Sequence, residues 1–197
     1  KSLADSTKLA AIRQSIKEKN LNWTAGESWI TRLSPQERKK IFMTSYTPPV
    51  VDKADIITLP QITELPSNLD WRNISLNDYQ GNYVTSIKNQ GQCGSCWAFS
   101  AVAQVESWWL IDKNRPDTTL DLSEQTLLSN NTIGSCNGGS TADALEWIQD
   151  NGIPPEWCFE YSANDSIPLD SAYVYWQNHT YTIPGWSYIT SEEVDVN

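Results

Sequence analysis

The sequence predicts an α+β fold, in which a helical body follows a smaller helical segment and leads into short strands and loops. Three observations predict this fold. Apolar residues recur at helical spacing from Cys96 to Asp112. The stretches 153–161 and 173–186 are rich in Tyr, Trp and Pro, which favours short strands and loops. Four prolines and little periodicity in residues 47–66 indicate an extended linker ahead of the body.

Two short helices are expected before the linker. Residues 8–19 carry apolar side chains at i, i+3 and i+7, which is the spacing of an amphipathic helix with a cationic outer face. The second helix has a strong start signal. Ser34 is the N-cap, Pro35 is the first helical residue and Glu37 is the capping-box partner. This helix should run to about residue 42.

Two further helices follow the long one in the body. One fits Ser123–Ser129, and the other fits Thr141–Asn151 with Ser140 as its N-cap. Two carboxylates stand in otherwise apolar helical surroundings, Glu106 in the long helix and Glu124 at the start of the next. Because buried polar groups in proteins are hydrogen-bonded, both are expected to be structural carboxylates at the edge of the core.

Composition and charge exclude two classes of function. The chain has 197 residues, of which 39% are apolar, and this is enough for a packed core. There is no run of 18 apolar residues, so no membrane span is expected. Residues 1–64 carry a net charge of +3 and residues 65–197 carry −13. An acidic body argues against nucleic-acid binding, which needs clustered cations.

The compartment is indicated by glycosylation sequons. The chain starts at Lys1 within a polar stretch, so it is expected to be processed or trimmed. Chance gives roughly three N-x-S/T sequons at this composition. Five occur, and the excess favours a secreted or vesicular protein; they lie at Asn22, Asn73, Asn130, Asn164 and Asn178.

The stretch KNQGQCGSCWAFS at 88–100 carries two cysteines three residues apart, Cys93 and Cys96, at the start of the long helix. A redox pair would need a buried strand leading into the motif, and SIKNQGQ is not one. A zinc site would need a second close pair of ligands, whereas Cys136 and Cys158 are 22 residues apart. The pattern favours one nucleophile beside one structural thiol.

Four motifs resemble those of the papain family of cysteine peptidases. Residues 89–100, which contain Cys-Gly-Ser-Cys-Trp, are similar to the nucleophile segment of the family. Leu-Asp-Trp-Arg at 69–72 resembles the mature N-terminus, and Leu-Ser-Glu-Gln at 122–125 the second helix. Cys-Asn-Gly-Gly at 136–139 resembles the turn that binds the substrate backbone. The resemblance implies a papain-like fold, mainly its helical left lobe.

The start of the chain resembles the short propeptide of cathepsin B-type enzymes. The likeness rests on residues 16–26 and on the helix that ends at 40–44, where Met43 replaces the usual Gly. The resemblance therefore divides the chain into a propeptide at 1–64 and the N-terminal lobe at 65–197, with the β-rich C-terminal lobe absent from the chain.

The same resemblance assigns roles to residues of the site. Cys96 would be the nucleophile, and the Gln90 side chain would donate to the oxyanion together with the Cys96 N–H. Gly138 and Gly139 would pair with the substrate backbone, and Ser140 would line the pocket. Neither a metal nor a cofactor is implied.

The resemblance also assigns the cysteines. Cys93 would form a disulfide with Cys136. The second bridge of the family usually starts where Asn130 stands, so Cys158 would be free or bridged to something outside the chain.

The catalytic histidine is expected outside these residues. The family places its His and Asn roughly 130–150 residues after the nucleophile. His179 follows Cys96 by only 83 residues, so we do not expect it to be catalytic. The chain alone is expected to be inactive and to need a second chain or the missing lobe.

Two functions remain open. The first is a lysosomal, vacuolar or secreted cathepsin-like protease precursor that cleaves peptide bonds in protein substrates, with the propeptide blocking the cleft until acid loosens it. The alternative is an inactive papain-fold protein that is retained as a structural or interaction subunit of an assembly. A downstream reading frame with a histidine in a strand-like context favours the first, and a stop codon near Asn197 favours the second.

Overall fold

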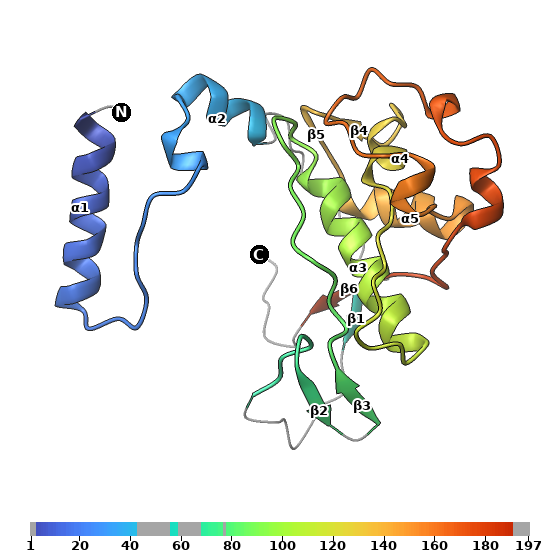
Figure 1. The fold of residues 1–197 in the computed structure, drawn as a ribbon, viewed down its shortest axis with the longest axis horizontal. Helices are drawn as coiled ribbons and strands as arrows, with labels where there is room; N and C mark the ends of the chain where they lie inside the picture. The colour runs from blue at the N-terminus through green and yellow to red at the C-terminus, as the bar shows by residue number, and fades with distance from the viewer. Residues whose placement is uncertain (1–2, 43–55, 59–67, 77, 191–197) are drawn as a thin grey trace. The chain divides into compact units, whose positions relative to one another are not determined.

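The computed structural model describes two compact units, Lys1–Lys40 and Ile41–Asn197, each of which is considered by itself (Figure 1). Most of the predicted linker at 47–66 lies outside the described residues, except for a short strand at Ile56–Thr58. The described residues are 3–42, 56–58, 68–76 and 78–190.

The first unit contains the two predicted helices. Helix α1 spans Leu3–Glu18 and begins earlier than the apolar spacing indicated. A short 3-10 helix, η1, spans Ile30–Arg32, and α2 spans Pro35–Ile41. The capping box is confirmed: the Ser34 N–H donates to Glu37 Oε2 at 2.7 Å, and the Glu37 N–H donates to Ser34 Oγ at 3.2 Å.

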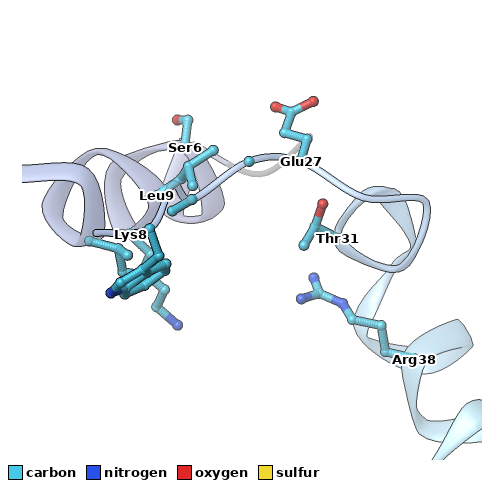
Figure 2. Close-up of a pocket in the computed structure, with 10 residues that line it drawn as sticks. Ser6, Lys8, Leu9, Glu27, Thr31 and Arg38 are labelled. Atoms are coloured by element: carbon cyan, nitrogen blue, oxygen red, sulfur yellow. The ribbon is translucent and has the colours of Figure 1, made fainter. Parts of the chain in front are cut away.

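The first unit has no buried core among its described residues, because every side chain from 6 to 40 is exposed or half-buried. Trp23 and Trp29 are about half exposed, at 52% and 49%. A cavity of about 410 Å³ opens beside α1, and Figure 2 shows Leu9 of α1 on one side of it and Arg38 on the other. Below about 40 residues a chain rarely builds a sufficient core alone, in line with the exposure of these side chains.

The second unit contains the three predicted body helices. Helix α3 spans Cys96–Asp112, α4 spans Glu124–Leu128 and α5 spans Thr141–Asn151. Ser123 caps α4 by accepting from the Thr126 N–H, and Ser140 caps α5 by accepting from the Asp143 N–H. Helix α3 packs against both α4 and α5 and forms the centre of the unit (Figure 1).

Strands are short in this unit. The described residues form three two-stranded sheets, one of which is parallel and two antiparallel. The pairs are β1 (Ile56–Thr58) with β6 (Tyr188–Thr190), β2 (Ile74–Leu76) with β3 (Tyr79–Gly81), and β4 (Gly134–Ser135) with β5 (Gly138–Gly139).

The Tyr-, Trp- and Pro-rich tract, expected to form short strands and loops, forms loops but no named strand between residues 153 and 186. Two isolated bridges involve residues of these stretches, Ile153 with Tyr181 and Pro155 with Leu122, and short 3-10 helices form elsewhere. Proline cannot donate a ladder hydrogen bond, and the tract instead folds over a local apolar cluster around Cys158. The 3-10 helices are η3 (Glu156–Cys158), η4 (Leu169–Ser171) and η5 (Trp176–His179).

The main core lies on the inner face of α3. Trp97 is 2% exposed and packs directly against two glycines of the β4–β5 hairpin. A Cβ added at Gly139 would lie 2.6 Å from the Trp97 ring, and one at Gly134 would lie 2.7 Å from it. Because real Cβ atoms do not approach so closely, both positions need glycine for Trp97 to fit.

A buried ion cluster joins α3 to α4. Lys88 Nζ lies 2.9 Å from an oxygen of Glu106, 2.9 Å from one of Glu124 and 2.7 Å from one of Asp121. The Glu106 side chain is fully buried and also accepts the Leu122 N–H at 2.8 Å. The structural role expected of Glu106 and Glu124 is therefore what the structure shows, and the cation that pairs with them is Lys88.

The cluster holds one cation against three carboxylates. Burial opposes the charge on Lys88, but the surrounding carboxylates outweigh it and raise the Lys88 pKa above its ordinary value. Burial also raises the pKa of Glu124 to about 7, because pairing with Lys88 only partly offsets the loss of water. A proton on Glu124 is therefore held more tightly in the folded state than in the unfolded chain.

The first prediction concerns stability against pH. Between 4.5, the ordinary value for Glu124, and about 7, its value when folded, the folded state keeps a proton that the unfolded state releases. This contribution to stability is complete below 4.5 and is lost as the pH rises through about 7. Glu124→Gln should remove it, so the rise in Tm on acidification should shrink by a few °C, since about 1 kcal/mol corresponds to roughly 2–4 °C in a chain of this size.

Thermal unfolding followed by circular dichroism at several pH values measures this difference. Glu146→Gln, which alters an exposed carboxylate on α5, is the matched control and should behave like the unaltered protein. Equal pH dependence in the unaltered protein and in Glu124→Gln would show that Glu124 is not the group responsible.

Candidate active site

The Cys96 thiol lies at the start of the longest helix of the second unit. Cys96 is the first residue of α3 and is half-buried with a free thiol. The first N–H groups of a helix have no partner inside it, and the helix dipole places partial positive charge there. A thiolate and a developing oxyanion are both stabilised at such a position, by about 0.3–1 kcal/mol from the dipole alone.

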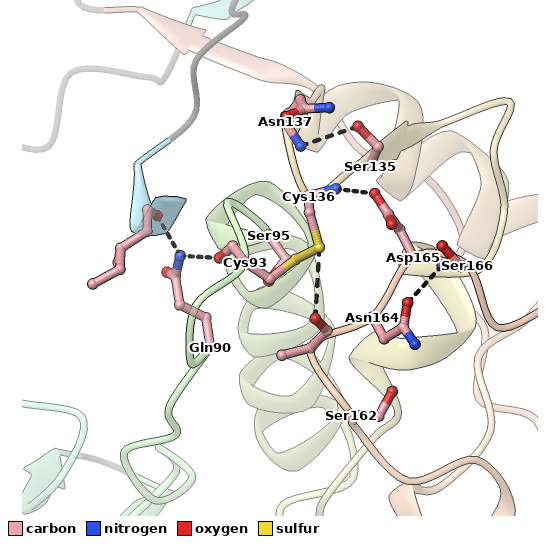
Figure 3. The surroundings of a disulfide bond; sticks show 12 residues. Gln90, Cys93, Ser95, Ser135, Cys136, Asn137, Ser162, Asn164, Asp165 and Ser166 are labelled. Atoms are coloured by element: carbon pink, nitrogen blue, oxygen red, sulfur yellow. Dashed lines mark hydrogen bonds between the residues drawn. A yellow bond between two sulfur atoms is a disulfide. The ribbon is translucent and has the colours of Figure 1, made fainter. Parts of the chain in front are cut away.

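The loop around Cys136 holds the nucleophile segment from one side. A disulfide joins Cys93 to Cys136, and the Gly94 N–H donates to the Cys136 carbonyl at 2.8 Å. A Cβ at Gly94 would lie 2.5 Å from that carbonyl oxygen, so only glycine allows this approach. The loop itself is fixed because the Cys136 N–H donates to Asp165 Oδ2 at 2.8 Å (Figure 3).

Gln90 lies within the same segment, six residues before Cys96, and its oxyanion role stays a prediction. Its side-chain nitrogen Nε2 donates to the Cys93 carbonyl at 2.6 Å and to the Ile41 carbonyl at 2.8 Å (Figure 3). Ile41 is 5% exposed, and the next carbonyl, that of Phe42, lies 3.2 Å from the Cβ position of Gly94. The Gln90 amide is thus already paired with carbonyl oxygens of this chain.

The predicted substrate-binding glycines have structural constraints of their own. Gly138 adopts φ +140°, which L side chains rarely adopt, and Gly139 makes room for Trp97. Ser140 is the N-cap of α5, and its side chain accepts the Asp143 N–H at 3.2 Å. These contacts explain the residue types without a substrate, so substrate binding at 138–140 stays a prediction.

Tyr161 contacts residues 89–100, although no pattern in the sequence indicates it. Its hydroxyl lies 2.8 Å from the Gln90 carbonyl and 2.6 Å from Ser95 Oγ. Its ring packs edge-on against Phe99 of α3, with centroids 4.9 Å apart. Tyr161 follows Gln90 by 71 residues and belongs to no local motif, so only the tertiary structure shows this contact.

The remaining cysteine has a different environment. Cys158 is free and 4% exposed, in a small apolar cluster with Phe159, Ala172 and Trp176. Burial raises the pKa of the Cys158 thiol above its ordinary value. Of the two free thiols, Cys158 is therefore the less reactive.

His179 lies in an exposed aromatic group. Its ring centroid is 5.1 Å from that of Trp157 and 6.3 Å from that of Tyr173. Packing against these rings gives His179 a structural placement in η5, and its lack of a catalytic role stays a prediction.

The structure bears on three further expectations. Four of the five sequon asparagines are exposed, whereas Asn130 is half-buried and accepts the Thr132 hydroxyl at 2.7 Å. Among the described residues, no group of three or more Cys, His, Asp or Glu side chains is placed to hold a metal ion. Within the same ranges, no helix is both long enough and apolar enough to cross a membrane.

Comparison with known proteins identifies the family. The family model described as papain family cysteine protease matches residues 65–195. The chain therefore belongs to the papain family of cysteine proteases. Over 101 residues, 51% of this chain, it is 42% identical to Peptidase 1 of Psoroptes ovis, and the match covers 28% of that protein.

The papain-like fold is confirmed by solved structures. Procathepsin L2 proteinase from the larval midgut of Tenebrio molitor matches with a TM-score of 0.65 at 24% identity, over 86% of this chain and 55% of that one. A recombinant stem bromelain precursor matches with a TM-score of 0.59 at 30% identity, over 92% of this chain and 53% of that one. The chain thus spans about half the length of these solved relatives.

The second prediction concerns the two free thiols. Under native conditions iodoacetamide should alkylate Cys96 at least about tenfold faster than Cys158, because reaction needs an accessible thiolate and Cys158 is buried. Peptide mass spectrometry against time measures both rates in one sample. Denaturation should bring the two rates together, and faster native labelling of Cys158 would contradict the placement of both thiols.

Proposed function

We propose that this chain is the N-terminal part of the precursor of a cathepsin-like cysteine protease, which hydrolyses peptide bonds through Cys96. The observation that carries the proposal is the position of Cys96, with an accessible free thiol at the N-terminus of α3 and Gln90 beside it. Membership of the papain family supports the reaction class, peptide-bond hydrolysis by a cysteine. The chain spans about half the length of its solved relatives, so the activity of the complete protein is part of this proposal.

In the proposed reaction the Cys96 thiolate attacks the carbonyl carbon of the scissile bond. The C–N bond breaks after a tetrahedral intermediate, whose oxyanion accepts hydrogen bonds from Gln90 Nε2 and the Cys96 N–H. An imidazolium gives its proton to the leaving amine, and water then hydrolyses the thioester to release the acid and the thiol. We assign this imidazole to the second lobe of the complete protein, for which the length of the relatives leaves room.

We further propose that residues 1–64 are a propeptide. The Ile41 carbonyl occupies a Gln90 N–H that the oxyanion would need, which is the contact expected of an inhibitory segment. The first unit exposes large apolar side chains and has no core of its own, as expected of a segment that folds on another surface. Two of the structural relatives are themselves described as a procathepsin and a precursor.

Charge supports an acid-sensitive propeptide and a lysosomal, vacuolar or secreted location. Residues 1–64 carry +3 and residues 65–197 carry −13, so the two parts attract each other at neutral pH. Protonation of carboxylates in acid weakens that attraction and loosens the propeptide. Burial raises the pKa of Glu124 to about 7, so this carboxyl is protonated in the same acidic range and the body gains stability where the propeptide is released.

Substrate recognition in this proposal uses the hairpin after Cys136. An extended substrate would pair its backbone with Gly138 and Gly139 and pass Ser140, which begins α5. The cathepsin B-like subtype is proposed from the propeptide motifs, and modification of the exposed sequons from their surface position.

One observation favours the alternative, an inactive papain-fold subunit. Cys158 is free and buried in an apolar cluster, and Asn130 stands where the family usually has the first cysteine of a second bridge. Loss of a disulfide is compatible with a chain that is stabilised by a partner in an assembly. The activity of the complete gene product separates the two functions.

The third prediction is the test of the proposed function. The complete gene product, activated at mildly acidic pH, should hydrolyse fluorogenic peptides, and Cys96→Ser should abolish this activity. Gln90→Ala should lower kcat by about 100-fold or more, because one oxyanion donor is lost. Gln104→Ala, at an exposed position on α3, is the matched control and should leave kcat unchanged.

The propeptide is tested in the same assay. Removal of residues 1–64 should raise the rate at neutral pH, where the Ile41 carbonyl otherwise occupies Gln90. A complete protein that carries no hydrolytic activity with or without residues 1–64 would favour the inactive subunit over the protease.

A further inference from the structure

The hydroxyl of Tyr161 links Gln90 to Ser95, which lie on either side of residues 91–94. Tyr161 donates its one hydroxyl proton to the Gln90 carbonyl at 2.8 Å. Ser95 Oγ lies 2.6 Å from the same hydroxyl. Because the Tyr161 proton is already used, Ser95 must donate to the Tyr161 oxygen. The result is a directed chain of hydrogen bonds from Ser95 through Tyr161 to the backbone of Gln90.

Ser95 gives up its usual capping role to make this bond. Ser95 is the N-cap of α3, where a serine hydroxyl ordinarily accepts an N–H of the first turn and stabilises the helix. Its side chain makes no such bond here, although it is fully buried. Its hydroxyl is bonded to Tyr161 instead, and Ser95 directly precedes Cys96. The position of Ser95 therefore sets where the Cys96 N–H and thiol lie.

Tyr161 is itself held from several sides. Its N–H donates to Glu156 Oε1 at 2.6 Å, and its ring meets Phe99 edge-on. The next residue, Ser162, donates its N–H to Oε1 of the buried Gln125 at 3.0 Å. Burial raises the Tyr161 pKa above its ordinary value, and the bond from Ser95 lowers it only in part, so the hydroxyl stays protonated.

We propose that Tyr161 is a positioning residue for the reaction of Cys96. It fixes the distance between Gln90 and the start of α3, and so fixes the two oxyanion donors relative to the thiol. This inference rests on the proposed function, because the donors matter only if Cys96 attacks a carbonyl. Tyr161 touches neither substrate nor Cys96 in this role; it acts through the Gln90 backbone and the Ser95 side chain.

Removal of the hydroxyl should therefore affect the transition state more than substrate binding. Small displacements of catalytic donors cost up to about 100-fold in rate. Tyr161→Phe, which keeps the ring on Phe99 but removes both hydrogen bonds, should lower kcat by about 10- to 100-fold and change KM by less than about twofold. A merely structural role would lower the Tm without this division between kcat and KM.

The fourth prediction is tested in the complete gene product with Tyr83→Phe as the matched control. Tyr83 is fully buried, whereas Tyr161 is half-buried; Tyr83 donates its hydroxyl to Asn114, and its ring contacts are to Trp71 and Tyr79. Tyr83→Phe should lower the Tm and leave kcat within about twofold. A peptidyl aldehyde forms a hemithioacetal with Cys96, and the oxygen of this adduct accepts from the oxyanion donors. The affinity of the aldehyde should therefore be lower for Tyr161→Phe than for the unaltered protein, by the same factor as the decrease in kcat/KM.

A second measurement does not depend on activity. Hydrogen exchange of the backbone amides in residues 90–96 should be faster in Tyr161→Phe than in the unaltered protein, and unchanged in Tyr83→Phe. Equal kcat and equal local exchange in the two variants would overturn the proposal. If the unaltered complete protein hydrolyses no peptide, the proposed function fails, and the exchange rates still decide whether Tyr161 holds this segment.

Discussion

The close approach of Gly94 to the Cys136 carbonyl is the contact on which the rest of the site depends. The hydrogen bond between them and the disulfide beside it fix the residues just before α3, and no side chain larger than that of glycine fits there. The same loop continues into the hairpin whose Gly139 packs on Trp97, the residue after Cys96. One contact therefore sets both the start of the helix and the turn proposed to bind substrate backbone.

The ion cluster around Lys88 also holds together segments that lead to the site. It joins the loop that leads to Gln90 to the two helices that carry Glu106 and Glu124, with both glutamates buried and Lys88 half-buried. A buried pair of this kind stabilises little by itself, because desolvation offsets the attraction, but loss of one partner leaves a buried charge unpaired. Because the cluster holds more carboxylates than cations, protonation of Glu124 in acid stabilises the folded protein. This agrees with the compartment proposed for this protein.

Local features of the fold could be predicted from the sequence, whereas contacts across the chain could not. The capping box at Ser34 and the start of α3 at Cys96 depend on residues that are neighbours in sequence, so local motifs predict both helix starts. The partners of Lys88 and Tyr161 lie far away in sequence, and no periodicity indicates them. The C-terminal tract forms the expected loops but not the expected strands, because aromatic and proline content does not separate strands from 3-10 turns, and Trp176 packs on a cluster that only the tertiary fold creates.

We propose that an imidazole of the complete protein ionises the Cys96 thiol, which then attacks a carbonyl whose oxyanion accepts from Gln90 once the Ile41 carbonyl has left. An experimental structure of the complete gene product tests this claim most directly. We expect an imidazole nitrogen within about 3–4 Å of Cys96 Sγ. A complete structure in which no histidine ring can reach that sulfur would contradict the account, and only the architecture would then be shared with the proteases.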